Sequence, residues 1–203
     1  MPAAKLLLVL GLAVGSLACF HLRTEKALAE EENLRALSTP RCELPGLAIA
    51  PPSPWYSVPI ESGEQGVEGC QMIWEEGDQY MGIMRLVAFD LLDRPEQLAD
   101  WENFIIAFES MIMARMGITV GEPVWKKGTV PINGDAFFNG RAIALKASLQ
   151  GVSHQNEVHI ILFESATHKY GISMLTPSKA DSAEVYAANT GAMAAVTQSI
   201  QPD

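Results

Sequence analysis

One stretch of the sequence decides the fold: Arg141-Ala-Ile-Ala-Leu-Lys-Ala-Ser-Leu-Gln150. Its large apolar side chains alternate with small or polar ones, which is the period of a strand with one buried and one wetter face. A polar turn leads to a second strand over residues 157–163, which has large apolar residues on both faces and is expected inside the sheet. A third strand begins at Tyr170. Because the turns between them are short, we expect the three strands to pair antiparallel.

A terminal helix is predicted after the third strand. Asp181-Ser-Ala-Glu184 resembles a capping box, in which the Asp181 side chain accepts a hydrogen bond from the amide near Glu184. Gly191 would cost this helix about 1 kcal/mol relative to alanine, so we expect a close contact with the sheet there. The apolar face is marked at helical spacing by Val185, Met193, Val196 and Ile200.

The first half of the domain predicts a hairpin followed by a long helix. Strands over residues 67–74 and 80–89 flank the turn Glu75-Glu-Gly-Asp78. The helix is expected to start at Asp93, which can cap it, and to end at Gly117. Residues 44–49 are expected to form a short edge segment, and residues 62–66 a flexible loop. The apolar stripe of the helix is formed by Leu98, Trp101, Ile105, Phe108, Ile112 and Met116.

The N-terminus has the pattern of an export signal. Lys5 precedes an apolar run over residues 6–20, which is shorter than the roughly 20 residues that a membrane span needs. Ala27-Leu-Ala29 fits a small-x-small cleavage site, so we expect residues 1–29 to be removed and the protein to be periplasmic or secreted. Two alternatives stay open: an anchor, either retained or formed by lipidation at Cys19, and no export. Residues 30–41 would be a lead-in to a single α+β domain over residues 42–203.

Export determines how the cysteines are interpreted. After cleavage only Cys42 and Cys70 would remain, and an even pair in an oxidising compartment is expected to form a disulfide. The alternative is two buried thiols. The sequence has no Cys-x-x-Cys pattern, so a redox role is not expected.

The charge of the chain limits its partners. The formal net charge is −10 at pH 7, which argues against binding to nucleic acid or to acidic lipid surfaces. It allows a basic protein partner, a cation, or nothing more than solubility. We expect a protein partner, and contact with a membrane only through an uncleaved or lipidated N-terminus.

Four residues are candidates for a binding surface, and each has a structural alternative. Arg85 lies among apolar residues, where it either forms an ion pair or contacts an anionic ligand. Trp125 lies in a loop or irregular strand over residues 121–131. Phe137 and Phe138 follow this segment near two glycines, and either cover the core or line a cleft.

No catalytic or metal-binding pattern stands out. The sequence has no Gly-x-Ser-x-Gly elbow, and the acidic residues at the hairpin tip lack the spacing of a calcium loop. We therefore expect no enzyme, no cofactor and no metal. The histidines beyond the signal match no zinc motif: His154, His159 and His168.

Four short motifs, in this order of elements, resemble the PsbP/DcrB-like superfamily. They are Leu44-Pro-Gly46, Ile132-Asn-Gly-Asp-Ala136, Tyr170-Gly-Ile-Ser-Met-Leu-Thr-Pro177 and Gln198-Ser-Ile200. The resemblance covers about residues 42–201. It implies an antiparallel sheet flanked by helices, an α/β/α sandwich, and a non-enzymatic role in binding or assembly. The family has no shared catalytic set, so the resemblance assigns no site residues.

These observations favour an exported, non-catalytic binding or accessory protein of the cell envelope. The alternative is a periplasmic immunity-type protein that neutralises a secreted toxin, because an acidic domain would associate faster with a basic effector. A minor alternative is an enzyme of unknown class.

Overall fold

A seven-stranded antiparallel sheet is the centre of the structure. The computed structural model describes residues 41–59, 68–77, 79–133, 135–151 and 154–202, which belong to a compact unit, Pro40–Asp203. Within these ranges the strand order of the large sheet is β3-β4-β5-β9-β8-β7-β6. The predicted signal and the loop predicted at residues 62–66 lie outside the described residues.

The large sheet joins the two halves of the domain. Its strands are β3 (Tyr56–Pro59), β4 (Glu68–Glu76), β5 (Gln79–Asp90), β6 (Ile118–Lys127), β7 (Phe138–Leu149), β8 (Asn156–Glu164) and β9 (His168–Pro177). The predicted antiparallel run of three strands is confirmed as β7, β8 and β9. The predicted hairpin is confirmed as β4 and β5, and β5 pairs antiparallel with β9. The fold is therefore α+β, with a mainly antiparallel sheet.

A second, smaller sheet brings together the first strands and the last strand of the domain. It consists of β1 (Cys42–Leu44), β2 (Leu47–Ile49) and β10 (Gln201–Pro202), in the order β1-β2-β10. The prediction of a single edge segment over residues 44–49 is therefore wrong. The chain reverses at Gly46, where φ is +75°, a backbone angle that glycine adopts without strain.

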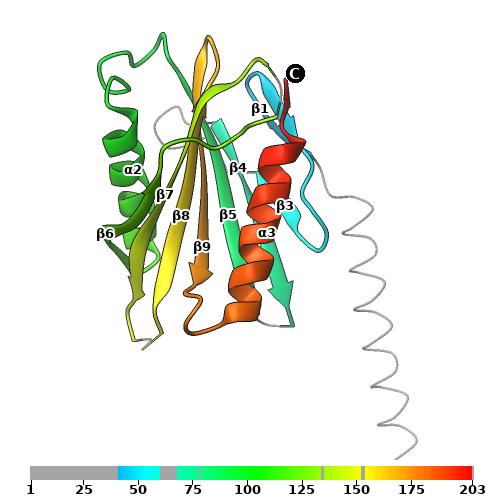
Figure 1. Cartoon of the computed structure of the whole chain (residues 1–203), viewed down its shortest axis with the longest axis vertical. Helices are drawn as coiled ribbons and strands as arrows, with labels where there is room; N and C mark the ends of the chain where they lie inside the picture. The colour runs from blue at the N-terminus through cyan, green and yellow to red at the C-terminus, as the bar shows by residue number, and fades with distance from the viewer. Residues whose placement is uncertain (1–40, 60–67, 78, 134, 152–153, 203) are drawn as a thin grey trace, which may run out of the picture. The chain divides into compact units, whose positions relative to one another are not determined.

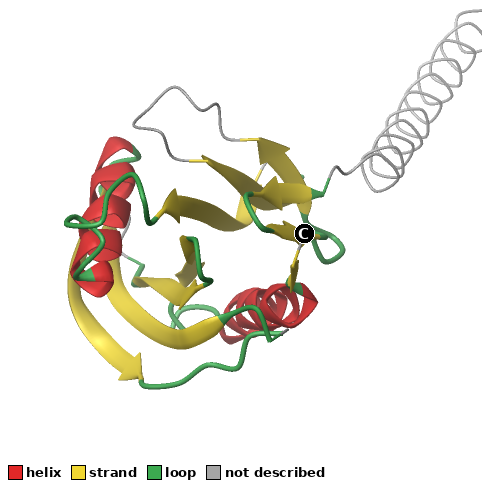
Figure 2. Cartoon of the chain, turned by 90° about the horizontal axis from the view of Figure 1, so that it is seen from above, coloured by secondary structure: helices red, strands yellow, loops and turns green. Residues whose placement is uncertain are grey.

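Two helices, α2 (Trp101–Arg115) and α3 (Ala183–Ser199), pack against opposite faces of the sheet. Figures 1 and 2 show them well apart, with strands between them. Leu86 of β5 belongs to the apolar cluster beneath α3, whereas its neighbour Val87 belongs to the cluster beneath α2. Because successive side chains of a strand point to opposite faces, the central strands bury both faces.

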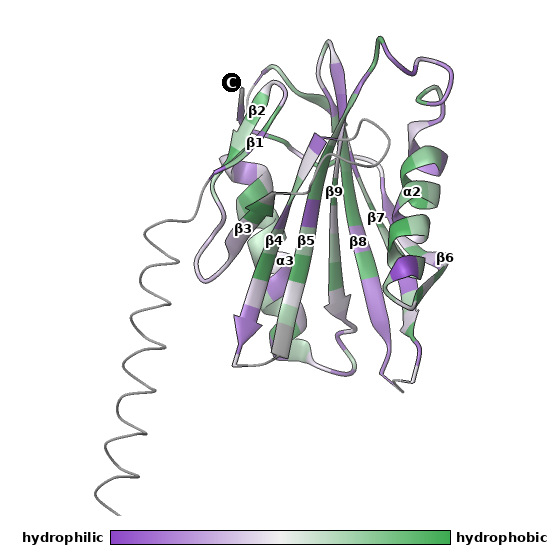
Figure 3. Ribbon diagram, turned by 180° about the vertical axis from the view of Figure 1, so that it is seen from behind, coloured by the Kyte–Doolittle hydropathy of each residue, from purple (hydrophilic) through white to green (hydrophobic). Residues whose placement is uncertain are grey.

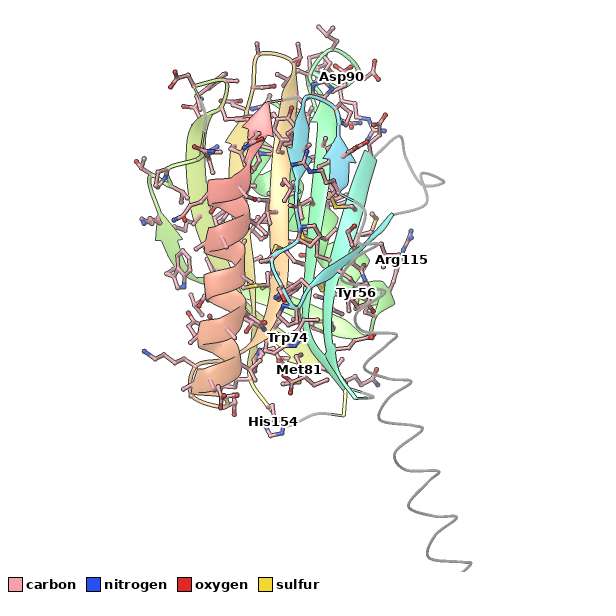
Figure 4. All side chains as sticks on the ribbon, turned by 90° about the vertical axis from the view of Figure 1, so that its right-hand side faces the viewer. Tyr56, Trp74, Met81, Asp90, Arg115 and His154 are labelled. Atoms are coloured by element: carbon pink, nitrogen blue, oxygen red, sulfur yellow. A yellow bond between two sulfur atoms is a disulfide. The ribbon has the colours of Figure 1, made fainter. Side chains whose placement is uncertain are left out.

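The close contact between α3 and the sheet occurs at Gly82 of β5. A Cβ atom at Gly82 of β5 would lie 2.6 Å from Oδ1 of Asn189 and 2.5 Å from the Trp55 ring, so only glycine fits. The Asn189 side chain also donates a hydrogen bond to the carbonyl of Met81, at 3.0 Å. Figure 4 labels Met81, near the hairpin end of β5. The expected contact at Gly191 is wrong, because a Cβ there would meet nothing within 4 Å.

Both helices begin differently from the prediction. The first starts at Trp101 instead of near Asp93, because Asp100 is the residue that accepts a hydrogen bond from the Asn103 amide, at 3.3 Å. The second has Ser182 at its N-cap position, without a side-chain cap. Asp181 accepts hydrogen bonds from the Ser178 hydroxyl at 2.6 Å and from the Gln155 amide at 2.9 Å, so the predicted capping box does not form.

The buried stripe of the first long helix is rotated relative to the predicted one. Its fully buried positions are four residues apart, and they include a carboxylate: Trp101, Ile105, Glu109 and Met113. Phe108 and Ile112 are only partly buried, and Met116 is 42% exposed. Three aromatic rings of this region, those of Trp101, Phe104 and Phe108, lie edge-on to Phe89 of β5 with centroids 5.2–5.3 Å away. Figure 3 shows apolar residues along α2 and the central strands.

A disulfide joins Cys42 and Cys70, as predicted. It links β1 of the small sheet to β4 of the large sheet, with 5.8 Å between the two Cα atoms. Both residues are buried. The disulfide therefore connects the two sheets within the core.

Removing the disulfide should destabilise the domain. The bond closes a loop between residues 28 positions apart, so the double variant Cys42→Ala/Cys70→Ala should lose about 3–4 kcal/mol of unfolding free energy. Urea denaturation of the oxidised wild type and the variant measures the difference. Equal stability would show that the bond does not constrain the unfolded chain.

Replacing Trp101 should remove a large part of the core beneath α2. Trp101 is 4% exposed, so Trp101→Ala should cost about 3–5 kcal/mol. Met116→Ala, at the exposed end of the same helix, is the control and should change stability by less than about 0.5 kcal/mol. Chemical denaturation followed by circular dichroism measures the unfolding free energy of both variants. Equal values would contradict the packing of Trp101 in the core.

Candidate functional site

A cleft of about 600 Å³ lies where β6 leaves the sheet and β7 enters it. Two segments line it, residues 128–132 after β6 and residues 137–141 at the start of β7. The two segments touch, because the Val130 amide donates a hydrogen bond to the Gly140 carbonyl at 2.8 Å. A Cβ at Gly140 would lie 2.1 Å from the Val130 carbonyl oxygen, so glycine is required for this approach.

The segment that forms one wall of the cleft is anchored on α3. Figure 1 shows the chain after β6 crossing from the outer edge of the sheet towards the C-terminal end of α3, and then returning to β7. There the Asn133 amide donates to the Thr197 carbonyl at 3.4 Å, and its side chain donates to the Ile200 carbonyl at 3.1 Å. The position of this wall is therefore set by α3 as well as by the sheet.

The cleft has a mixed lining, in which apolar side chains lie beside a larger polar surface. Phe137 is 7% exposed and packs edge-on against Phe163 and Tyr170, with ring centroids 5.6 and 5.8 Å away. These contacts hold its ring in place. Phe138, the next residue, is 47% exposed and is available to a ligand. Both aromatic residues line the cleft, together with Val130, Pro131 and Ile132.

Arg141 is the charged residue of the lining. Its Nη1 lies 3.9 Å from a carboxylate oxygen of Glu102 on α2, and Lys126 of β6 bonds the other oxygen of the same carboxylate. The Arg141 Nε atom is buried and has no hydrogen-bond partner among the residues that the structure describes. Glu102 therefore compensates two cations, and the guanidinium is incompletely paired.

A second acidic residue lies beside the cleft. Glu164 of β8 accepts hydrogen bonds from the Asn139 side chain and, at 3.0 Å, from Lys169 of β9. Burial raises the pKa of Glu164, but these two hydrogen bonds and the nearby cations outweigh burial and lower it. Glu164 is therefore an ionised partner of its neighbours.

Trp125 does not line the cleft and belongs to a cluster of rings. Its ring is edge-on to His159 of β8 at 5.4 Å, and His159 in turn lies 5.6 Å from Tyr186 of α3. The Glu157 carboxylate is 2.8 Å from Nε2 of His159. Burial, and then the charge of Glu157, raise the pKa of Tyr186. The cluster joins edge strand β6 to α3 through β8.

Arg85 lies within the core, 6% exposed, and pairs with Glu109 of α2 at 2.7 Å. Burial raises the pKa of Glu109, and the charge of Arg85 offsets this only in part. Ser173 of β9 also lowers this pKa, although neither its hydroxyl nor Oε1 of Glu109 reaches hydrogen-bond geometry with any partner. The pair crosses the interface between the sheet and α2.

Two of the four candidate residues therefore meet in one place. Phe137 and Phe138 line the cleft, whereas Arg85 and Trp125 lie elsewhere. Sequence reasoning missed Arg141, because it was assigned only as the first residue of a strand. The available signal was Gly140, whose small size allows the chain before β7 to approach closely.

Within the described ranges, no three His, Cys, Asp or Glu residues are grouped so that they could hold a metal ion. The helices placed by the structure include none with the length and apolar character to cross a bilayer.

Comparison with known proteins does not assign the chain to a family. No protein-family model and no curated protein match it. Among solved structures it is similar to a crystal structure from Bacteroides thetaiotaomicron VPI-5482, with 14% sequence identity and a TM-score of 0.40. The match covers 81% of this chain and 49% of that chain, so this chain spans about half the length of that protein. At this TM-score the likeness says nothing about function.

Breaking the buried ion pair should destabilise the domain more than replacing it. Glu109→Leu leaves the Arg85 charge buried and unpaired, and should cost about 3–5 kcal/mol. The double variant Arg85→Met/Glu109→Leu should recover most of this loss, because no buried charge remains. A double-mutant cycle by urea denaturation measures both values. A Glu109→Leu protein as stable as wild type would contradict the importance of the pair.

Proposed function

We propose that the chain is an exported, non-catalytic binding or accessory protein of the cell envelope, and that the cleft between residues 128–132 and 137–141 is its binding site. The cleft is the observation that carries the proposal. Its lining combines apolar and aromatic side chains with a larger polar surface that includes one guanidinium, so that it offers contacts to both the apolar and the polar parts of a ligand. The Arg141 guanidinium and the rings of Phe137 and Phe138 would bind and orient the ligand.

Export is supported by two independent features. The N-terminal sequence has the basic start, short apolar run and small-residue site of a secretory signal. The buried disulfide between Cys42 and Cys70 belongs to the kind of crosslink that persists in oxidising compartments. Both favour the periplasm or secretion.

The finer description of the fold is also a proposal. We propose an α/β/α sandwich of the PsbP/DcrB-like kind, in which one helix covers each face of the antiparallel sheet. The order of the elements supports it, with a hairpin, a helix, an edge strand, three antiparallel strands and a terminal helix. Members of that superfamily act in binding or assembly, which agrees with the proposed role.

Export predicts a defined product. Expression of the full chain in a Gram-negative host should give periplasmic protein that lacks residues 1–29, as measured by fractionation and intact-mass spectrometry. Its mass should not change on alkylation without reductant, because both remaining cysteines are bonded. Full-length protein in the cytoplasm with two free thiols would contradict export.

Binding predicts that a change at the cleft removes the ligand. Small molecules extracted from purified wild type should include a compound that is depleted at least about tenfold from Phe138→Asp, because the substitution places a charge in the apolar part of the lining. Leu92→Asp is the matched control, since Leu92 is 83% exposed and does not line the cleft. Identical extracts from all three proteins, together with no binding in a ligand screen, would contradict the proposed site.

A further inference from the structure

We infer that the cleft binds a small amphipathic carboxylate, whose charged group meets Arg141 and whose apolar part lies against Phe138. The inference rests on the proposed function, since it names the ligand class of the same cleft. It follows from three features of the described residues: an incompletely paired guanidinium, a local excess of positive charge, and an apolar wall beside both.

The guanidinium is prepared for an anion. The Arg141 side chain is 42% exposed, while its Nε atom is buried and has no hydrogen-bond partner within the described ranges. The group has therefore lost part of its hydration without gaining full compensation, which is costly for a charge. A carboxylate at the exposed part of the guanidinium would supply charge-assisted hydrogen bonds, the strong kind in proteins. Glu102 does not fill this role, because it lies 3.9 Å from Nη1 and also bonds Lys126. Glu164 acts on Arg141 through its charge, but its oxygens bond Asn139 and Lys169.

The charge around the cleft is opposite to that of the whole chain. The charged residues connected to the lining by ion pairs or hydrogen bonds are Lys126, Arg141 and Lys169 against Glu102 and Glu164, an excess of one positive charge. The chain as a whole carries −10. Salt screens exposed charges beyond about 8–10 Å under physiological conditions. An anion in the cleft therefore interacts mainly with the local cations.

The apolar part of the ligand has a defined place. Phe138 is 47% exposed and lines the cleft beside Arg141. Val130 and Ile132 line the opposite segment, and both also pack against the core beneath α3. Covering these side chains would stabilise the complex by about 25 cal/mol per Å² of apolar surface removed from water. The cleft thus favours a molecule that carries both a charge and an apolar group.

The geometry favours a small molecule over an extended peptide. A volume of about 600 Å³ lies within the range of small-molecule sites. A peptide that adds a strand needs free backbone groups on the wall of its site. Here the Val130 amide and the Gly140 carbonyl already bond each other. A peptide would lose these main-chain hydrogen bonds, whereas a short acid needs none.

Calorimetric titration with three probes of equal chain length tests the inference: octanoate, octan-1-ol and octylammonium at pH 7.5. Octanoate should bind at least about tenfold more tightly than either of the others, since one hydrogen bond to a charged group supplies that difference. Arg141→Gln should abolish the preference, Arg141→Lys should restore part of it, and Phe138→Ser should weaken octanoate and octan-1-ol alike. Lys179→Gln, which removes an exposed cation outside the cleft, is the charge-matched control and should behave as wild type.

The outcomes separate the inference from the proposed function. Equal binding of octanoate and octan-1-ol, lost in Phe138→Ser, would overturn the carboxylate inference and leave the cleft as a binding site. Octanoate binding that Arg141→Gln does not change would overturn the inference too. So would tight binding of a peptide with a C-terminal phenylalanine when octanoate does not bind. Failure of all probes, with no compound extracted from wild type, would overturn both. Thermal melting confirms that each variant is folded.

Discussion

The packing of helices onto strand glycines is the constraint on which the structure depends. On one face of the sheet, Gly82 of β5 leaves room for Trp55 and for Asn189 of α3. On the other face, Gly171 of β9 leaves room for Ile105 of α2, since a Cβ there would lie 2.9 Å from the isoleucine side chain. The two strands are neighbours in the sheet, so both helices rest on the same central pair. This pair also joins the early hairpin to the late strands.

The same arrangement positions the cleft. The contacts of α3 with β5 fix the helix, and the Thr197 and Ile200 carbonyls at its end accept hydrogen bonds from Asn133. One wall of the cleft, residues 128–132, therefore depends on its attachment to α3. The other wall is the start of β7. Arg141 meets Glu102 of α2, so both helices contribute to the surroundings of one site.

Much of the fold could be predicted because its signals are local. The alternation over β7 and the apolar residues on both faces of β8 were recognisable from the period of a strand. The hairpin turn was recognisable from Gly77, which adopts a positive φ of 61° in the structure. Helix starts were predicted less well, because several residues compete to cap. Asp181 instead accepts hydrogen bonds from Ser178 and from the Gln155 amide, and the contact with Gln155 was identifiable only once β8 and β9 were placed. The site was predicted in part, through Phe137 and Phe138.

The sequence by itself determined the hairpin, the run of three antiparallel strands, the candidate cysteine pair and the existence of two helices, because each depends on periodicity, turn length or cysteine count. Only the tertiary structure decided which helix face is buried, since Glu109 enters the core through its pairing with Arg85 of a distant strand. Only the tertiary structure, too, brought Arg141 to Glu102 of α2 and the Val130 segment against Gly140. The physical reason is that contacts between segments far apart in the chain leave no period in either segment.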